Sequence, residues 1–326
     1  LHRNHRIKNI KITVYDKTMM KTALGNKISA VGTVRFFDVP RNFGNYDQKF
    51  YYEKQGISLS VFSTKVKMLS EETWAVREGL LKFREKCHQI VCGILGKEKG
   101  GMISGILLGE KSEMSPKWKE MYQVNGIGHI LAISGLHLSF IGNFLYKGLR
   151  KMGFSYKISG GAVSVFLILY TVMTGAGVST LRALMMFLIK IGADITGRVY
   201  DLPTSLSVAA AVIICRSPQY FFDAGFLLSF GAVLGIILLK PILEKLFPCE
   251  KKWAEGICFS VAIQLFLFPV TLYFFFEVPT YALLLNIFVI PLMPFLLGMA
   301  LFGVAICFIF QSLGVWILKG SGFFLT

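Results

Sequence analysis

Eight basic and aromatic side chains lie close together near the start of the chain. They are Arg35, Phe36, Phe37, Arg41, Phe43, Lys49, Tyr51 and Tyr52. Cationic groups pair with phosphates and aromatic rings stack on bases, which is how sequence-tolerant single-strand binding works. The pattern predicts a surface that binds single-stranded nucleic acid. An ordinary barrel core with a solvated basic face is the alternative, and composition alone favours it.

A second set of polar residues interrupts the apolar segments that follow. They are His129, Ser134, His137, Arg182, Asp223, Gln264 and Asn286. Polar groups in hydrocarbon are costly, so they face the interior of a helical bundle or a wet cavity. This set predicts a channel or polar pathway. For Arg182 and Asp223, a structural ion pair, or side chains that reach the membrane interface, stays open as an alternative.

The sequence contains no signature of a common enzyme class. The six cysteines are scattered, and no Cys/His group has zinc-ligand spacing. The motifs HExxH, GxSxG, GxxxxGK[ST] and HxHxDH do not occur. TGAGVST (174–180) has the composition of a phosphate-binding loop, yet it lacks the lysine and a preceding soluble strand. We therefore expect no catalytic residues, no metal and no cofactor in this chain.

Short runs of β-branched and aromatic residues occupy the first 70 positions. The runs are 10–15, 27–37, 49–53 and 56–62, separated by Gly, Asn, Asp and Pro. They predict a small β-barrel over residues 1–70. From Glu71, capped by Ser70, apolar residues recur every three or four positions, which predicts amphipathic connecting helices over 71–125. Such a helix packs on a domain or lies on the membrane surface, and the pattern does not choose between them.

Residues 126–326 are far more apolar. The predicted spans are 127–146, 158–174, 178–195, 202–215, 221–239, 254–276, 280–295 and 295–310, with another beginning near 313. Several are shorter than the ~20 residues that a perpendicular span needs, and Gly and Pro interrupt them. Such broken helices are tolerated when they are buried in protein or line a wet cavity. The fold class expected is a polytopic α-helical membrane bundle of about 8–9 spans, with an N-terminal extracytoplasmic β-barrel.

The charge distribution explains a net charge of +16 on a chain that is 54% hydrophobic. Residues 1–126 hold 22 basic and 12 acidic side chains, against 13 and 7 in the remainder. Alternate loops of the apolar part collect the cations Lys147, Arg150, Lys151, Lys157, Arg198, Lys240, Lys245, Lys251 and Lys252. The loops between them carry Arg216 alone. Because cationic loops stay in the cytoplasm, residues 1–126 are predicted to lie outside it.

The segment GIGHILAISGLH (126–137) resembles the signature of the ComEC-type competence membrane proteins. Further segments follow in the order of that family: LLGEK (107–111), TGAGVSTLRALMM (174–186), ITGRVYD (195–201), DAGFLLSFGAVLG (223–235) and LLNIFVIPLMP (284–294). PRNFGNYDQKFYYEKQGI (40–57) looks like part of the external OB-like domain of the family. The resemblance implies an OB-like domain over 1–70 and a transmembrane competence domain over 126–326. We expect that domain to be incomplete at its C-terminal end, and the chain to be a middle portion of a longer protein.

The resemblance implies a channel-type protein of the bacterial plasma (inner) membrane that takes up transforming DNA as a single strand. The implied partners are single-stranded DNA, the lipid bilayer, a DNA receptor, a helicase or motor and a second copy of the chain. It also makes single-strand binding the favoured interpretation of the external residues. The motif positions carried over are His129, Ser134, Gly135, His137, Arg182, Asp223 and Gly225. The alternatives are a permease or lipid transporter, and the membrane module of a nuclease whose catalytic metallo-β-lactamase-like domain lies elsewhere.

Overall fold

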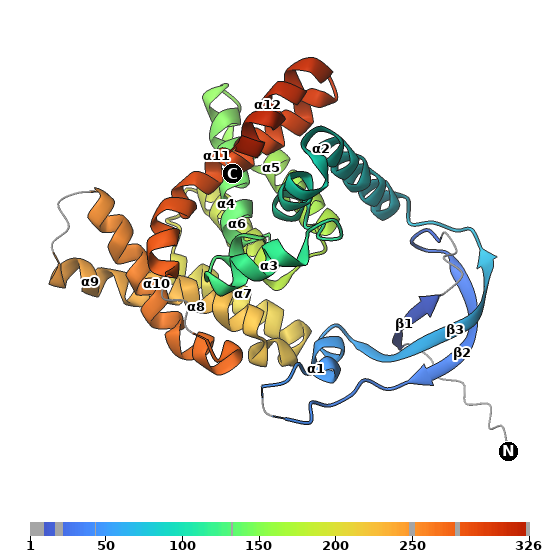
Figure 1. Ribbon diagram of the computed structural model, residues 1–326. Coiled ribbons are helices and arrows are strands. Elements are labelled where there is room, and N and C mark those ends of the chain that lie inside the picture. Colours follow the sequence, from blue (N-terminus) through green and yellow to red (C-terminus); the bar gives the residue numbers. More distant parts are fainter. Residues whose placement is uncertain are drawn as a thin grey trace. The chain divides into compact units, whose positions relative to one another are not determined.

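The computed structural model describes residues 10–16, 22–42, 44–131, 133–247, 252–277 and 281–323. The chain divides into two compact units, Leu1–Gly79 and Leu80–Thr326 (Figure 1). We call them the strand unit and the helical unit. Phe43, one of the residues predicted to bind DNA, lies outside the described residues.

The sheet of the strand unit has three strands, β1 (Lys11–Asp16), β2 (Lys27–Arg35) and β3 (Ile57–Ser70). The central strand is β3, with β1 parallel on one side and β2 antiparallel on the other. The register of β2 shifts between Val31 and Gly32, where a Cβ atom would overlap the backbone of Phe62. Within the described residues the strands form an open sheet, so the predicted OB-like barrel is not confirmed.

The segment 49–53, predicted as a strand, is part of a helix, so that prediction was wrong. Helix α1 covers Gln48–Glu53, and the Oδ1 atom of Asp47 accepts a hydrogen bond from the amide of Phe50 at 2.8 Å. An aspartate at this position satisfies an amide that the first helical turn leaves free. The N-cap therefore outweighs the β propensity of Phe50, Tyr51 and Tyr52.

Helix α2 (Ala75–Leu108) begins four residues after the predicted start and consists of two helices that meet at Gly96. Gly96 has φ 78°, in the left-handed region that glycine adopts at low cost. After it the chain folds back on the first half of α2. This is seen at Gly100, where a Cβ atom would stand 2.6 Å from the Cα atom of Cys92. Residues 100–108 are all buried. The second half of α2 therefore belongs to the core of the helical unit.

The helical unit continues with twelve further helices over its described residues, ten α-helices and two 3-10 helices. They are α3 (Pro116–Val124), the 3-10 helix η1 (Gly128–Leu131), α4 (Gly135–Lys151), α5 (Tyr156–Met173), α6 (Val178–Thr196), α7 (Leu202–Arg216), the 3-10 helix η2 (Pro218–Phe222), α8 (Ala224–Leu238), α9 (Lys240–Leu246), α10 (Lys252–Phe275), α11 (Ala282–Cys307) and α12 (Gln311–Phe323). The predicted spans 280–295 and 295–310 form the single helix α11, with Pro291 and Pro294 inside it.

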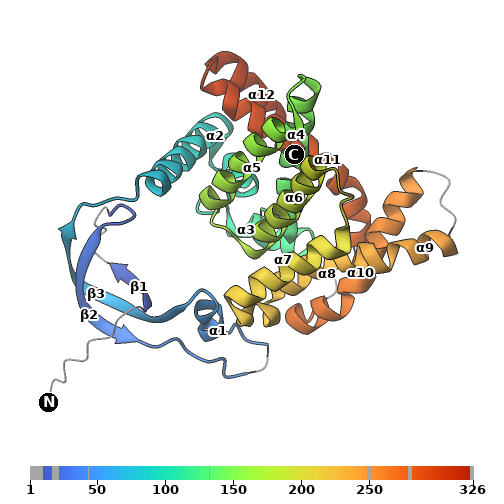
Figure 2. The same ribbon diagram turned by 180° about the vertical axis from the view of Figure 1, so that it is seen from behind.

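Helices α4, α5 and α6 lie side by side in the main core (Figure 2). Gly135 of α4 packs near Ala183 of α6, and Gly142 near Phe187, so α4 and α6 run parallel. The order is reversed for α5, whose early residue Gly160 faces the late α6 residues Ile191 and Ile195. The buried half of α2, together with α11 and α12, completes this core.

A second buried cluster joins α7 and α8 to the other face of α6. Its buried members are Leu206, Ala209, Ile213, Phe226 and Phe230. Helix α8 also packs closely on α10. The helical unit thus holds two layers of packed side chains that meet at α6.

Four stretches are long and apolar enough to cross a membrane, by length and composition. They are Tyr156–Met173, Ala224–Leu246, Ala254–Phe275 and Ala282–Cys307. Leu202–Arg216 is apolar but shorter. Four candidate spans make this a membrane protein, while the predicted count of about 8–9 is not confirmed.

Candidate functional site

Aromatic rings from β1, from β3, from the segment after β2 and from α1 gather on the strand unit. Tyr15 of β1 stacks on its parallel neighbour Phe62 of β3, with ring centroids 4.9 Å apart. The hydroxyl groups of Tyr15 and Tyr52 are 3.2 Å apart, and Tyr52 stacks on Phe37 at 4.1 Å. Tyr51 lies edge-on to Tyr52 at 5.3 Å. We call these five residues the aromatic row.

Part of the aromatic row is open to solvent. Tyr15, Tyr51 and Phe62 are each about 40% exposed, whereas Phe37 is only 8% exposed. Phe37 therefore supports the row from beneath, and the exposed rings are the ones that a base can reach. Tyr46, 68% exposed, lies 5.7 Å from Tyr51 and extends the surface.

Cationic side chains flank these rings. The guanidinium of Arg35 lies 5.1 Å from the centroid of Phe62, and the ammonium of Lys54 lies 5.0 Å from that of Tyr51. The ammonium of Lys11 donates to the carbonyl oxygen of Gln55 at 3.4 Å. The surface therefore combines exposed rings and positive charge, the two features that single-strand binding surfaces combine.

Two phenols of this surface, those of Tyr52 and Tyr46, stay uncharged at neutral pH. The hydrogen bond with Tyr15, followed by burial, raises the pKa of Tyr52 to about 12. Burial and the neighbouring Tyr51 raise the pKa of Tyr46. The phenols of Tyr52 and Tyr46 therefore develop no negative charge that would repel a phosphate.

The structure brings together some of the predicted DNA-binding residues and leaves others apart. Arg35, Phe37, Tyr51 and Tyr52 belong to or flank the aromatic row. Lys49 pairs with Glu53 at 3.8 Å, while Phe36 (79% exposed) and Arg41 are open to solvent.

Sequence reasoning missed Tyr15 and Phe62, together with the cations Lys11 and Lys54. The alternation of side chains along each strand could have indicated that Tyr15 and Phe62 share a face of the sheet with other side chains of their own strands. It could not have indicated that the two rings stack across β1 and β3.

The predicted polar residues of the helical unit form separate local groups. The amide of Ser134 donates to Nδ1 of His137 at 3.1 Å, which fixes the first turn of α4. His137 is 1% exposed, and His129 is the second residue of the 3-10 helix η1. Gln264 is half-buried on α10. Asn286 is 8% exposed on α11, and its buried Oδ1 atom has no hydrogen-bond partner among the residues that the structure describes.

Arg182 and Asp223 both act on helix α8. The Nη1 atom of Arg182 donates to the carbonyl oxygen of Ser229, and its guanidinium lies 5.8 Å from the centroid of Phe230. Asp223 is the N-cap of α8 and accepts from the amide of Phe226 at 3.2 Å. Asp223 precedes Ser229 by six residues, about 9 Å along a helix axis. Each side chain therefore bonds to the backbone of α8.

Polar side chains also join the two halves of α2, a feature that sequence reasoning missed. The Nη2 atom of Arg84 and the Oε2 atom of Glu110 are 2.5 Å apart. Nδ1 of His88 and Oγ of Ser104 are 2.8 Å apart, and both residues are buried. The LLGEK motif (107–111) draws attention to Glu110. It does not identify the partner, Arg84, which lies 26 residues earlier.

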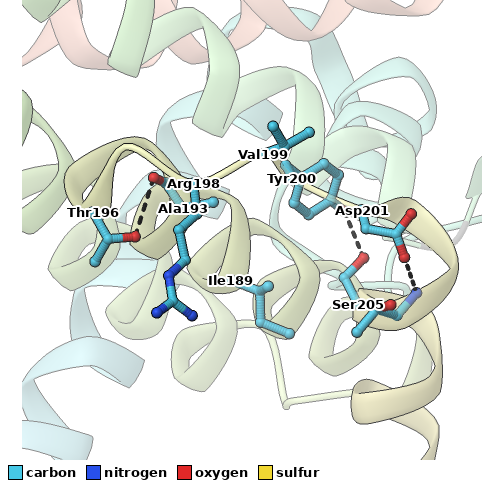
Figure 3. A pocket seen from close by; sticks show the side chains of 9 residues that line it. Ile189, Ala193, Thr196, Arg198, Val199, Tyr200, Asp201 and Ser205 are labelled. Carbon is cyan, nitrogen blue, oxygen red and sulfur yellow. Dashed lines mark hydrogen bonds between the residues drawn. The ribbon is translucent and has the colours of Figure 1, made fainter.

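A pocket of about 230 Å³ lies at the corner between α6 and α7, on the ITGRVYD segment (Figure 3). Its polar groups bond to one another: the hydroxyl groups of Tyr200 and Ser205 are 2.8 Å apart, and Asp201 accepts from the amide of Thr204 at 2.9 Å. The hydroxyl and amide of Thr204 hold the pKa of Asp201 below its usual value. These bonds set the geometry of the corner rather than a site for a ligand.

No group of three or more His, Cys, Asp or Glu side chains with the geometry of a metal site occurs among the described residues. The candidate sites that remain are the aromatic row with its cations and the buried polar groups of the bundle. Fold and site together define a class: a multi-helix membrane protein that carries a basic, aromatic-rich strand unit.

Comparison with known proteins identifies the family within that class. The family model described as "Competence protein" matches residues 106–326. The chain therefore belongs to this family, and the resemblance to ComEC-type proteins is confirmed. No solved structure matches the chain.

Two relatives cover most of this chain. "ComE operon protein 3" of Bacillus subtilis (strain 168) is 25% identical over 273 residues, which is 83% of this chain and 34% of that protein. "Recombination protein 2" of Haemophilus influenzae (strain Rd) is 23% identical over 283 residues, 81% of this chain and 35% of that protein. An uncharacterized protein of Mycoplasma genitalium is 29% identical over 213 residues, 60% of this chain and 53% of that protein. The chain thus spans about a third of the length of the first two relatives.

Proposed function

We propose that this chain takes up transforming DNA as a single strand across the bacterial plasma membrane. Family membership supports a role in competence. The observation that carries the single-strand claim is the aromatic row with its flanking cations Arg35 and Lys54. In this proposal the strand unit lies outside the cytoplasm and receives the strand, and the helical unit passes it inward as a channel.

In competence this chain would act with partners that drive transport and deliver DNA. The sequence contains no GxxxxGK[ST] nucleotide-binding motif. A helicase or motor therefore supplies the driving force and a DNA receptor delivers the substrate, while the chain itself contributes no catalysis. A second copy of the chain is a further proposed partner.

The test is equilibrium binding of a fluorescent (dT)20 strand by the full chain in lipid nanodiscs. Stacking on an aromatic side chain is worth about 1–3 kcal/mol per base. We therefore expect Phe62→Ala and Tyr51→Ala each to weaken binding about tenfold, and wild-type affinity to fall steeply as salt rises.

The matched control is Tyr156→Ala. Tyr156 is also an exposed tyrosine (51%) with an arginine against it, Arg150, but it lies in the helical unit. This variant should bind like wild type. If the full chain does not bind (dT)20 at low salt, or binds it with an affinity that does not change with salt, the result contradicts single-strand binding and favours a solute or lipid transporter.

A further inference from the structure

Two parallel helices of the bundle begin at the same place. The amide of Gly135, the first residue of α4, donates to Oγ of Ser179 in the first turn of α6 at 3.0 Å. The N-terminal end of a helix carries about half a positive charge. Because α4 and α6 run parallel, these partial charges add instead of cancelling.

The loop before α6 leaves its backbone open to approach. Gly175 has φ 91° and Ala176 has φ 50°, and the exposed Gly177 is the N-cap of α6. A Cβ atom at Gly175 would meet nothing within 4 Å. The first amides of a helix have no acceptor within it, so a glycine-rich entry of this kind suits an anion.

Arg182 lies one helical turn beyond this loop, and it is 92% buried. Its Nη2 atom lies where a Cβ atom at Gly135 would stand, which directs the guanidinium to the start of α4. Within the described ranges its Nε atom is buried with no hydrogen-bond partner, and so is Oγ of the neighbouring Ser229. Among the described residues no carboxylate lies within 4.0 Å of the guanidinium. A buried cation that no anion balances is costly to fold.

We propose that the joint start of α4 and α6, with Arg182 behind it, is an anion site that takes a phosphate of the DNA strand. Segment 174–180 has the composition of a phosphate loop without the lysine, and Arg182 supplies the missing cation from the next turn of the same helix. The ligand supplies the charge that the protein leaves unbalanced. This inference rests on the proposed function and places one contact of the strand inside the helical unit.

The test is photo-crosslinking of a 4-thiothymidine tetranucleotide to the full chain in lipid nanodiscs, with adducts located by mass spectrometry. We expect adducts in 133–147 or 174–190 with wild type, at least tenfold fewer with Arg182→Gln, and a reduction of threefold or less with Arg182→Lys. A tetranucleotide with neutral methylphosphonate linkages should give few adducts in these segments with wild type. Lys190→Gln is the matched control, because it removes a cation from the same helix that already bonds to Oδ1 of Asn143 at 2.7 Å.

The outcomes separate this inference from the proposed function. Adducts on the strand unit without adducts in these segments overturn the anion site and leave the proposed function standing. Equal adducts with wild type and Arg182→Gln, or with charged and neutral strands, also overturn it. The absence of any adduct contradicts the proposed function itself. If Arg182→Gln does not accumulate, Gly135→Ala supplies the test, because it keeps the arginine and fills the space beside Nη2; normal adduct yield then counts against the site.

Discussion

The clearest single contact in the helical unit is the ion pair that closes the α2 hairpin. Arg84 and Glu110 are 20% and 27% exposed and lie 2.5 Å apart. Burial by itself would raise the pKa of Glu110, but the hydroxyl and amide of Ser112 and the charge of Arg84 outweigh it. The pKa of Glu110 is therefore lowered. A lowered pKa means that the folded state favours the charged form of this carboxyl group.

We expect Glu110→Gln to lower the free energy of unfolding by about 1–2 kcal/mol at pH 7, since hydrogen bonds to charged groups are worth about this much. The pKa in the folded state is below the ordinary value, so this stability is present above the unfolded pKa. It is lost as the pH falls through the folded pKa. Thermal unfolding in nanodiscs should show the wild type beginning to converge on the variant as the pH falls below about 4.3, the ordinary pKa of a glutamate.

The exposed Glu120 of α3 provides the control. Glu120→Gln should leave the unfolding midpoint unchanged across the same pH range. A Glu110→Gln midpoint equal to wild type at pH 7 would show that the pair does not stabilise the hairpin.

At the level of helices, glycine explains how α8 and α10 approach each other. A Cβ atom at Gly235 would stand 2.9 Å from the Cβ atom of Phe266 and 3.0 Å from the carbonyl oxygen of Ala262. At Gly231 a Cβ atom would stand 2.9 Å from Leu267. Small residues four apart let two membrane helices pack closely. Helix packing therefore accounts for both glycines of the DAGFLLSFGAVLG segment beyond Gly225.

We expect Gly235→Ala to lower the free energy of unfolding by about 1–3 kcal/mol, because the added methyl group meets backbone that must move. Gly256→Ala makes the same change on α10, where a Cβ atom meets nothing within 4 Å. That control should be neutral or stabilising, as alanine favours a helix. Thermal unfolding of the two variants side by side decides the matter, and equal midpoints would refute close packing at Gly235.

Across the whole molecule, the basic residues of the two parts of the chain are proposed to have different roles. Residues 1–126 hold 22 of the 35 basic side chains, and this part contains the aromatic row. The cations of the remaining chain cluster in alternate loops, and we propose that their task is to orient the helices in the membrane. This division predicts opposite sides of the membrane for Tyr46 of the strand unit and Arg198 of the α6–α7 corner.

Accessibility to a membrane-impermeant thiol reagent tests that orientation in intact cells. We expect Tyr46→Cys to be labelled from outside, and Arg198→Cys to be labelled only after the membrane is opened. Mass spectrometry of the labelled peptides separates these sites from the native cysteines. Labelling of Arg198→Cys in sealed cells would reverse the proposed orientation.

The sequence predicted the helices well where each one coincides with a continuous apolar segment. The predicted segments 158–174, 178–195 and 202–215 match α5, α6 and α7 within two residues. The prediction failed where one hydrogen bond overrides the β propensity of a segment, as at Asp47, which caps α1. It failed again where tertiary burial continues a helix through Pro291 and Pro294.

The class of protein and its family follow from the order of residues alone, because hydropathy, loop charge and motif spacing are properties of neighbours along the chain. Which side chains meet does not follow from that order. Tyr15 and Phe62 are 47 residues apart, and so are Gly135 and Arg182, and Arg182 and Ser229. Only the folding of strands and helices against one another brought these pairs together. The same packing left the guanidinium of Arg182 buried, with no carboxylate within 4.0 Å of it in the part of the chain that the structure describes.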